Sequence, residues 1–145
     1  MYTIELSAHI DAPVEKAYDY LSDLRKHGEW SSSVTRIELV TDEPIGVGSE
    51  FRASETIPAR FYSYARLTAL EPPRRIAWVS TDRRFLRTEW EFELSPEDGG
   101  THLVQRARFE GIYWLGPLVL NLWRKPKIPA ENRRSLERIK AILER

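Results

Sequence analysis

The chain opens with strict alternation of apolar and polar residues from Tyr2 to Ile10. A period of two residues puts every second side chain on one face of a strand, so this segment predicts a half-buried β-strand. Similar strand and turn signals continue through the middle of the chain. They predict six further strands over Val34–Val40, Val47–Thr56, Arg60–Leu70, Arg75–Ser80, Phe85–Leu94 and Thr101–Gly111.

Breakers separate these strands, with Pro58 after the third one and turns at Glu71–Arg74 and Ser95–Gly100. The strand that contains Leu67 and Leu70 has an ambiguous inward face, because these two residues differ in parity. A β-bulge between them would resolve the ambiguity.

Helical signals follow the first strand. Asp11, Pro13 and Glu15 are typical of a helix start with Asp11 as the N-cap. Apolar residues then recur at helical spacing, and we expect the helix to end near Asp23 and a short second helical turn to cover Leu24–Trp30. The apolar positions are Val14, Ala17, Tyr18 and Leu21.

The hairpin formed by the last two strands shows its inner face clearly. Leu86, Thr88, Trp90, Phe92 and Leu94 alternate with charged residues, and Leu103, Gln105, Ala107 and Phe109 do the same on the second strand. Matching the two apolar faces defines the pairing parity, because a slip of one residue would invert every side chain. The outer face then places Glu89 and Glu91 beside Arg106.

The C-terminal segment, Leu115–Arg145, predicts a long helix. An apolar stripe runs back from Leu143 in steps of three and four residues. It passes through Ile139, Leu136, Asn132, Pro129, Lys125, Leu122 and Leu118. Pro126 and Pro129 remove backbone donors, so we expect either one bent helix or two in tandem.

This order of elements is typical of the α+β class. Several motifs also occur in a characteristic order, namely Ile10–Glu15, Tyr18, Leu21–Asp23, His27, Trp30, Val47–Ser49, Glu71–Trp78 and Asp98–Thr101. In these motifs the chain resembles the START-like superfamily, also called SRPBCC, in its polyketide cyclase/dehydrase branch. The resemblance covers essentially the whole of residues 1–145.

The resemblance implies a helix-grip fold, in which a curved seven-stranded antiparallel sheet wraps around the C-terminal helix and two short helices separate strands 1 and 2. It also implies a hydrophobic cavity between sheet and helix. Family functions include lipid or hormone binding, polyketide aromatisation and cyclisation, and coenzyme Q chaperoning, so the fold does not decide the activity. No catalytic motif is shared among these members, and the catalytic residues stay unknown.

Composition excludes several classes of protein. The chain has 145 residues and equal numbers of basic and acidic side chains, 22 each, so it lacks the positive charge that drives nucleic-acid binding. It has no cysteine, which rules out disulfides and thiolate chemistry. The longest apolar run, Ile112–Trp123, is shorter than the about 20 residues of a membrane span. With no secretory signal at the start, we expect one cytoplasmic domain.

The sequence predicts no metal site and no cofactor, because His9, His27 and His102 do not form ligand-spaced clusters. Gly46–Gly48 enters a strand and is interpreted as a turn, and Ser31–Ser33 as a polar loop. The candidate binding residues are instead large aromatic side chains on the predicted inner faces. They are Trp30, Phe51, Trp78, Trp90, Phe92 and Phe109, which either fill the core or line the cavity.

A few polar residues share these faces and could orient a ligand. Glu55 is either a solvated strand end or a buried carboxyl able to move protons, and Gln105 is either a core amide or a cavity group. Asn132 continues the helical stripe. Leu118, Leu122 and Tyr64 complete the candidate set, although Tyr64 belongs to the strand of ambiguous parity.

Three hypotheses follow for the function. The first is the binding of a small hydrophobic, lipid-like or aromatic molecule without catalysis, and the second is a cyclase or aromatase that uses polar cavity residues. The third is docking to a membrane or a protein partner through Ile112–Lys127, where apolar residues adjoin a basic cluster. We favour the interpretation that this segment covers the cavity mouth. The protein would be a monomer or a homodimer.

Overall fold

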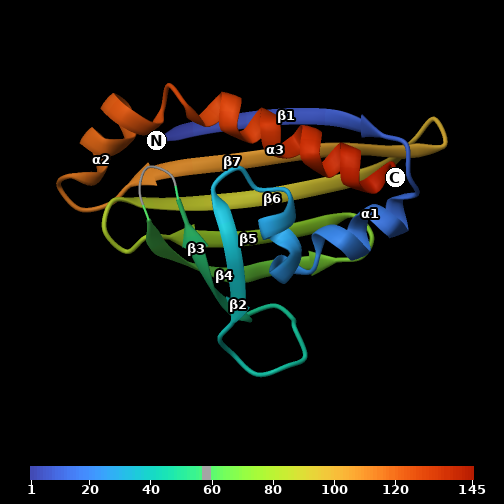
Figure 1. The fold of residues 1–145 in the computed structure, drawn as a ribbon, viewed down its shortest axis with the longest axis horizontal. Helices are drawn as coiled ribbons and strands as arrows, with labels where there is room; N and C mark the ends of the chain where they lie inside the picture. The colour runs from blue at the N-terminus through green and yellow to red at the C-terminus, as the bar shows by residue number, and fades with distance from the viewer. Residues whose placement is uncertain (57–59) are drawn as a thin grey trace.

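A computed structural model describes residues 1–56 and 60–145 (Figure 1). Its seven strands form one antiparallel sheet in the order β1-β7-β6-β5-β4-β3-β2. The strands are β1 Tyr2–Ile10, β2 Val34–Leu39, β3 Glu50–Glu55, β4 Phe61–Glu71, β5 Arg75–Thr81, β6 Leu86–Glu97 and β7 Gly100–Gly111. The helices are α1 Val14–Leu21, the 3-10 helix η1 Leu24–Glu29, α2 Gly116–Leu118, the π-helix η2 Val119–Arg124 and α3 Ile128–Leu143. The expected α+β class and helix-grip arrangement are confirmed.

The start of α1 differs from the prediction. Pro13, not Asp11, is the N-cap residue, and no side chain caps this end of the helix. Asp11 lies too far back along the chain, and its backbone N–H donates to the Glu144 carboxylate at 2.8 Å. Asp23 does act as a cap, because its carboxylate accepts from the backbone N–H of Arg25 at the start of η1.

The bulge that would resolve the parity of β4 is present. The pairing of β4 with β5 shifts between Leu67 and Ala69, so that Leu67 and Leu70 both pack toward the core. Thr68 is the extra, exposed residue of this bulge. The expected interruption at Pro58 falls on residues 57–59, which are outside the described residues.

In two places the strand boundaries differ from the prediction by more than one residue. Strand β3 begins at Glu50 and not at Val47, because Gly48 takes a φ of +94°, which belongs to a turn. The β6–β7 loop was predicted over Ser95–Gly100, but the strands continue to Glu97 and Gly100. Only Asp98 and Gly99 form the turn, and both have a positive φ. A two-residue hairpin turn needs positive φ values if its twist is to match that of the two strands.

The pairing of β6 with β7 is as expected. Trp90 lies opposite Ala107, and Phe92 lies opposite Gln105. On the outer face the Arg106 guanidinium contacts the Glu91 carboxylate at 2.9 Å. Such exposed pairs contribute only about 0.2–1 kcal/mol each, and they select the register more than they stabilise the sheet.

The C-terminal segment forms two helical pieces in tandem, separated at residues 125–127. An i→i+5 bond from the Lys125 N–H to the Leu120 carbonyl widens the last turn of η2. This π-turn and the helix break at residues 125–127 change which side of the segment faces the sheet, so that Leu120 is the buried residue. The prediction that Leu118 and Leu122 face inward was therefore wrong, since both are exposed.

The apolar interior is divided into two clusters. The larger contains the C-terminal half of α3, helix α1 and residues such as Phe92 and Leu103, and the smaller contains Phe109, Leu120 and Ile128. Trp90 packs against both clusters. A cavity lies beside Trp90, between these two clusters and the segments that cover the sheet.

Replacing Ile139, which is fully buried in the larger cluster, tests this packing. We expect Ile139→Ala to lower the free energy of unfolding by about 2–5 kcal/mol, because it leaves a cavity under α3. The matched control is Glu137→Ala on the exposed side of the same helix, with an expected change within about 0.5 kcal/mol. Urea unfolding followed by circular dichroism measures both, and equal losses would contradict the packing.

Candidate functional site

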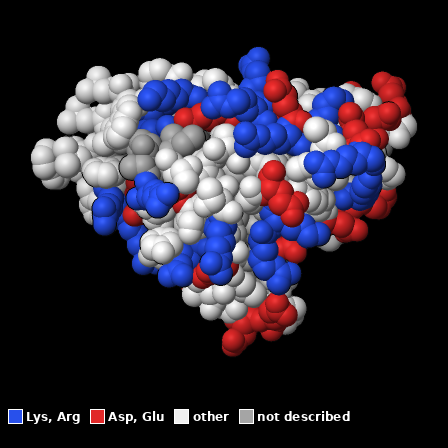
Figure 2. All heavy atoms as spheres, in the orientation of Figure 1, with Lys and Arg blue, Asp and Glu red and all other residues white. Residues whose placement is uncertain are grey.

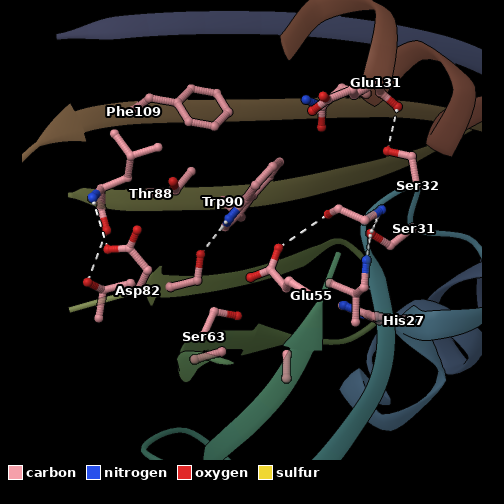
Figure 3. A pocket seen from close by; sticks show the side chains of 18 of the residues that line it. His27, Ser31, Ser32, Glu55, Ser63, Asp82, Thr88, Trp90, Phe109 and Glu131 are labelled. Carbon is pink, nitrogen blue, oxygen red and sulfur yellow. Dashed lines mark hydrogen bonds between the residues drawn. The ribbon is translucent and has the colours of Figure 1, made fainter. Parts of the chain in front are cut away.

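A cavity of about 210 Å³ lies between the inner face of the sheet and the segments that cover it. Strands β2 to β7 form its floor, and the Ser31–Ser33 loop, η2 and the first half of α3 form its cover. Figure 3 shows side chains from these elements converging on one space. The volume lies between the about 150 Å³ of a cavity that binds benzene and the about 300–1,000 Å³ of pockets for drug-sized ligands.

One side of the cavity is aromatic. The Trp78 and Trp90 rings stack with centroids 6.0 Å apart, and Phe109 meets Trp90 edge-on at 5.5 Å. The Trp90 indole N–H donates to the Ser80 hydroxyl at 3.0 Å, which holds the ring in place (Figure 3). These rings form a rigid apolar wall, since each is held by a neighbour as well as by its strand.

The other side carries a partly buried carboxyl group, that of Glu55 at the end of β3. Its Oε1 accepts from the Ser33 hydroxyl at 3.3 Å. Burial raises the pKa of the Glu55 carboxyl, and the hydroxyls of Ser63 and Ser33 and the charge of Arg124 offset this only in part. A raised pKa makes the ionised carboxylate a better proton acceptor than an ordinary exposed glutamate.

A two-contact ion pair closes the cover of the cavity. The Arg124 guanidinium, at the end of η2, contacts both oxygens of the Glu131 carboxylate on α3, at 3.0 and 2.6 Å. Both side chains are about nine-tenths buried and both line the cavity. Because the pair bridges the break at residues 125–127, it orients η2 on α3 and places charge at the cavity wall.

His27 lies below the aromatic wall. Its ring sits 4.7 Å from Trp30 and 5.0 Å from Trp78, and its Nε2 donates to the Leu21 carbonyl. Burial lowers the pKa of this imidazole to about 4, so the ring is neutral at physiological pH. The buried Trp30 indole N–H has no partner among the described residues, although other atoms of Trp30 line the cavity.

The cavity includes seven of the twelve candidate residues and leaves out five. Those that line it are Trp30, Phe51, Glu55, Trp78, Trp90, Phe109 and Asn132. Phe92 is buried behind Trp30 and Trp78, and Gln105 is buried under α3, where its Nε2 donates to the Asn132 Oδ1 at 3.4 Å. That any of the twelve candidate residues binds a ligand stays a prediction.

The remaining three candidates face away from the cavity. Leu118 and Leu122 lie on the outer side of the α2–η2 segment, for the reason given above. Tyr64 was wrongly aligned with the inner face, because the β4 bulge leaves Ser63 and Leu67 as the inward residues. The Tyr64 ring instead stacks against the Arg83 guanidinium, 3.6 Å from its centroid.

Sequence analysis missed the small hydroxyl residues of the lining. Ser31–Ser33 were interpreted as a loop, yet all three line the cavity. Ser32 donates its hydroxyl to the Glu131 carbonyl and its N–H to the Ser135 hydroxyl, which ties this loop to α3 (Figure 3). No spacing signal marks Ser32, because its partners on α3 lie about 100 residues away in the chain.

Neither a metal centre nor a membrane span emerges within residues 1–56 and 60–145. No group of three or more potential ligand side chains lies close enough to hold a metal ion there. None of the helices in this part of the chain has the length and apolar character to cross a bilayer. The arrangement is that of an apolar chamber with hydroxyl, carboxyl and indole groups on its wall.

The family model described as "Polyketide cyclase / dehydrase and lipid transport" matches residues 1–144. Comparison with curated proteins gave no match. Solved structures share the fold at low sequence identity. The Zhui aromatase/cyclase from Streptomyces sp. R1128 aligns with a TM-score of 0.82 at 16% identity, over 99% of this chain and 94% of its own.

Two further structures align over nearly the full length of both chains. A START superfamily protein from Mycobacterium smegmatis has a TM-score of 0.79 at 15% identity, covering 99% of this chain and 98% of its own. A protein from Deinococcus radiodurans has a TM-score of 0.69 at 23% identity, with coverages of 99% and 98%. At these identities the likeness establishes the fold alone.

The buried neutral His27 predicts a loss of stability in acid. Its pKa in the folded protein, about 4, lies below the unfolded value of 6.5, so the unfolded chain takes up the proton first as the pH falls. The stabilisation is complete above pH 6.5 and is lost as the pH falls toward 4, by about 3 kcal/mol in all.

Urea unfolding of the wild type and of His27→Gln at pH 7 and pH 4 measures this effect. The variant has no imidazole to protonate at this position. Between pH 7 and pH 4 we therefore expect its free energy of unfolding to fall by about 3 kcal/mol less than that of the wild type. His102→Gln, at a partly exposed position, is the control, and its stability should fall between pH 7 and pH 4 about as that of the wild type does. Parallel curves for wild type and His27→Gln would refute the assignment.

Proposed function

Because the chain belongs to the polyketide cyclase / dehydrase and lipid transport family, we propose that it binds a small, largely apolar molecule in the cavity between the sheet and α3. One observation carries this proposal: the interior is hollow where the sheet, η2 and α3 meet, and the hollow has an aromatic wall and hydrogen-bonding groups facing it. A chamber of this kind binds an apolar body by burial and orients it by a few polar contacts.

The lining favours a ligand of one or two rings with a polar end. The apolar body would lie against Trp78, Trp90 and Phe109, where flat aromatic surface is available. Its polar end would face Glu55 and Ser33 and exchange hydrogen bonds with them. The identity of the natural ligand, the oligomeric state and the expected cytoplasmic location stay predictions.

A probe that combines two rings with one hydroxyl, 2-naphthol, tests this proposal. We expect it to quench tryptophan fluorescence saturably and to raise the thermal midpoint, since binding to the folded state alone stabilises it. Ala65→Phe fills the cavity from β4 and should weaken binding by at least about tenfold, because the space for the probe is lost.

The control for this variant is Arg66→Phe, the next residue of the same strand, whose side chain is exposed on the other face. It adds the same ring outside the cavity, so binding should stay within about twofold of the wild type. Absence of 2-naphthol binding to the wild type, or equal binding by both variants, would argue against a ligand chamber.

A second function, a cyclase-type reaction, is favoured by Glu55 in particular. The ionised carboxylate would take a proton from a carbon next to a carbonyl group of the substrate, and the carbonyl oxygen would carry the resulting charge as an enolate. That carbon would then form a bond to a second carbonyl carbon of the same molecule, and Glu55 would return the proton to the new alkoxide oxygen. Ser33 and Ser63 would hold the carboxyl in place.

Glu55→Gln separates the two functions. The glutamine amide keeps the size of the side chain and an acceptor oxygen, but it cannot carry the proton. We therefore expect the cyclisation of a poly-β-ketone to slow by about 10²–10⁴-fold. The affinity for 2-naphthol should stay within about threefold of the wild-type value. In the wild type the rate should rise with pH through an apparent pKa above 4.5, since the base is the ionised form. Undiminished turnover by Glu55→Gln would eliminate this residue as the base, and no turnover by the wild type would leave binding as the function.

A further inference from the structure

The chain from Tyr113 to Trp123, which includes α2 and most of η2, exposes large apolar side chains at one end of the molecule. Trp114 is 80% exposed, Leu122 77% and Tyr113 74%. Leu115, Leu118 and Trp123 are exposed as well, and we call these six residues the apolar face. In Figure 2 the end of the molecule that carries α2 in Figure 1 is largely white, with blue side chains beside it. Contiguous exposed apolar surface of this kind marks an interaction site.

The apolar face is held by the fold. A side-chain Cβ at Gly116 would collide with the Phe85 carbonyl oxygen, and one at Gly111 with the Pro117 nitrogen, so backbone packs closely on backbone here. The Ile112 N–H donates to the Phe85 carbonyl at 2.7 Å, and Leu120 is buried beneath the segment. The exposed rings therefore project from a fixed base, and they cannot turn inward without breaking these contacts.

Basic residues border the apolar face. From Gly111 to Ala130 the chain contains Arg124, Lys125 and Lys127 and no acidic residue. Arg124 is neutralised by Glu131, but Lys125 and Lys127 are exposed. The β5–β6 loop, which the Ile112–Phe85 hydrogen bond holds against this segment, adds the exposed Arg83 and Arg84. Asp82 in the same loop offsets one of these two charges, so the segment and the loop that border the apolar face each carry net positive charge.

We propose that the apolar face and its cationic border form a docking surface for an anionic lipid bilayer. Tryptophan and tyrosine are suited to the bilayer interface, where one end of the ring is apolar and the other is hydrated. Basic residues near an anionic bilayer contribute about 1 kcal/mol each. A second copy of the chain is a poorer occupant, because a two-fold contact would bring the same cationic borders together.

Docking in this orientation places the ligand cavity at the membrane. Val119 and Trp123 line the cavity, whereas Leu118 and Leu122 of the same segment face outward. One short segment is therefore both a wall of the cavity and the surface that touches the bilayer. The docking proposal goes beyond the proposed function and does not rest on it, because vesicle binding needs no occupant in the cavity.

Sedimentation with vesicles tests the proposal. We expect the full chain to bind vesicles of about 70% phosphatidylcholine and about 30% phosphatidylserine more tightly than vesicles of phosphatidylcholine alone, and less tightly as salt rises from about 0.1 to about 0.5 M. Trp114→Glu combined with Leu122→Glu should weaken binding to the mixed vesicles by at least about tenfold. Lys125→Glu combined with Lys127→Glu should abolish the preference for phosphatidylserine.

Val40 and Val47, which are 61% and 65% exposed, provide the matched control because they lie away from the apolar face. Val40→Glu combined with Val47→Glu adds the same charge and should leave vesicle binding within about twofold of the wild type. All variants change exposed side chains, so an unchanged thermal midpoint shows that each is folded.

Equal sedimentation of the wild type with both vesicle types, or equal loss in the Trp114/Leu122 variant and the Val40/Val47 control, would overturn the proposal. A second result would also overturn it. If the wild type is a dimer in analytical ultracentrifugation and does not bind vesicles, and Trp114→Glu with Leu122→Glu dissociates that dimer, the apolar face is a contact between copies. Retention of 2-naphthol binding in the Trp114/Leu122 variant would show that a loss of docking leaves the cavity intact.

Discussion

Helix α3 is anchored to the sheet by apolar contacts at two places, and the structure depends on what lies between them. Ile128 belongs to the smaller apolar cluster, whereas Leu136, Ile139 and Leu143 belong to the larger one. The buried residues between these anchors are polar, namely Glu131, Asn132 and Ser135. Polar groups cannot fill an apolar gap without hydrogen-bond partners, so this stretch is bound to Arg124, Gln105 and Ser32, and the cavity remains open beneath it.

The consequence for function is a chamber with two kinds of wall. Strands β5 to β7 contribute rings that are held by one another, and the end of β3 and the Ser31–Ser33 loop contribute the Glu55 carboxyl and hydroxyl groups. An interior that holds a hollow and an unpaired indole donor gives up some packing energy that a solid core would have. A ligand that fills the hollow would recover part of the packing energy, which is why binding is the function that the geometry supports best.

The segment from Gly111 to Ala130 links the chamber to the surface. Its π-helical turn moves Leu120 inward and leaves neighbouring apolar side chains outside, so one piece of chain forms an inner wall and an outer face. Exposed apolar side chains of this size mark an interaction site, and basic residues border them. The same combination of apolar residues and positive charge is what an anionic interface attracts.

Local patterns in the sequence determined the elements of the fold. Period-two alternation located β1 and the β6–β7 hairpin with the correct inner face, and the order of motifs indicated the helix-grip arrangement. Seven of the twelve candidate residues line the cavity, and five of these seven lie on strands, where parity decides which side chains point inward. The Leu67–Leu70 conflict even signalled a bulge, although its effect on Tyr64 was not foreseen.

Only the tertiary structure decided the rest. Leu118 and Leu122 face solvent because the π-helical turn of η2 and the helix break at residues 125–127 change which side of the helix is apolar. A pattern extrapolated with the α-helical period of 3.6 residues shows neither the π-turn nor the break. Ser32, Ser135, Arg124 and Glu131 meet at the cavity through contacts between elements that are distant in the chain or separated by the break. A sequence pattern records which face of an element is apolar, whereas the space enclosed between elements depends on how their side chains meet.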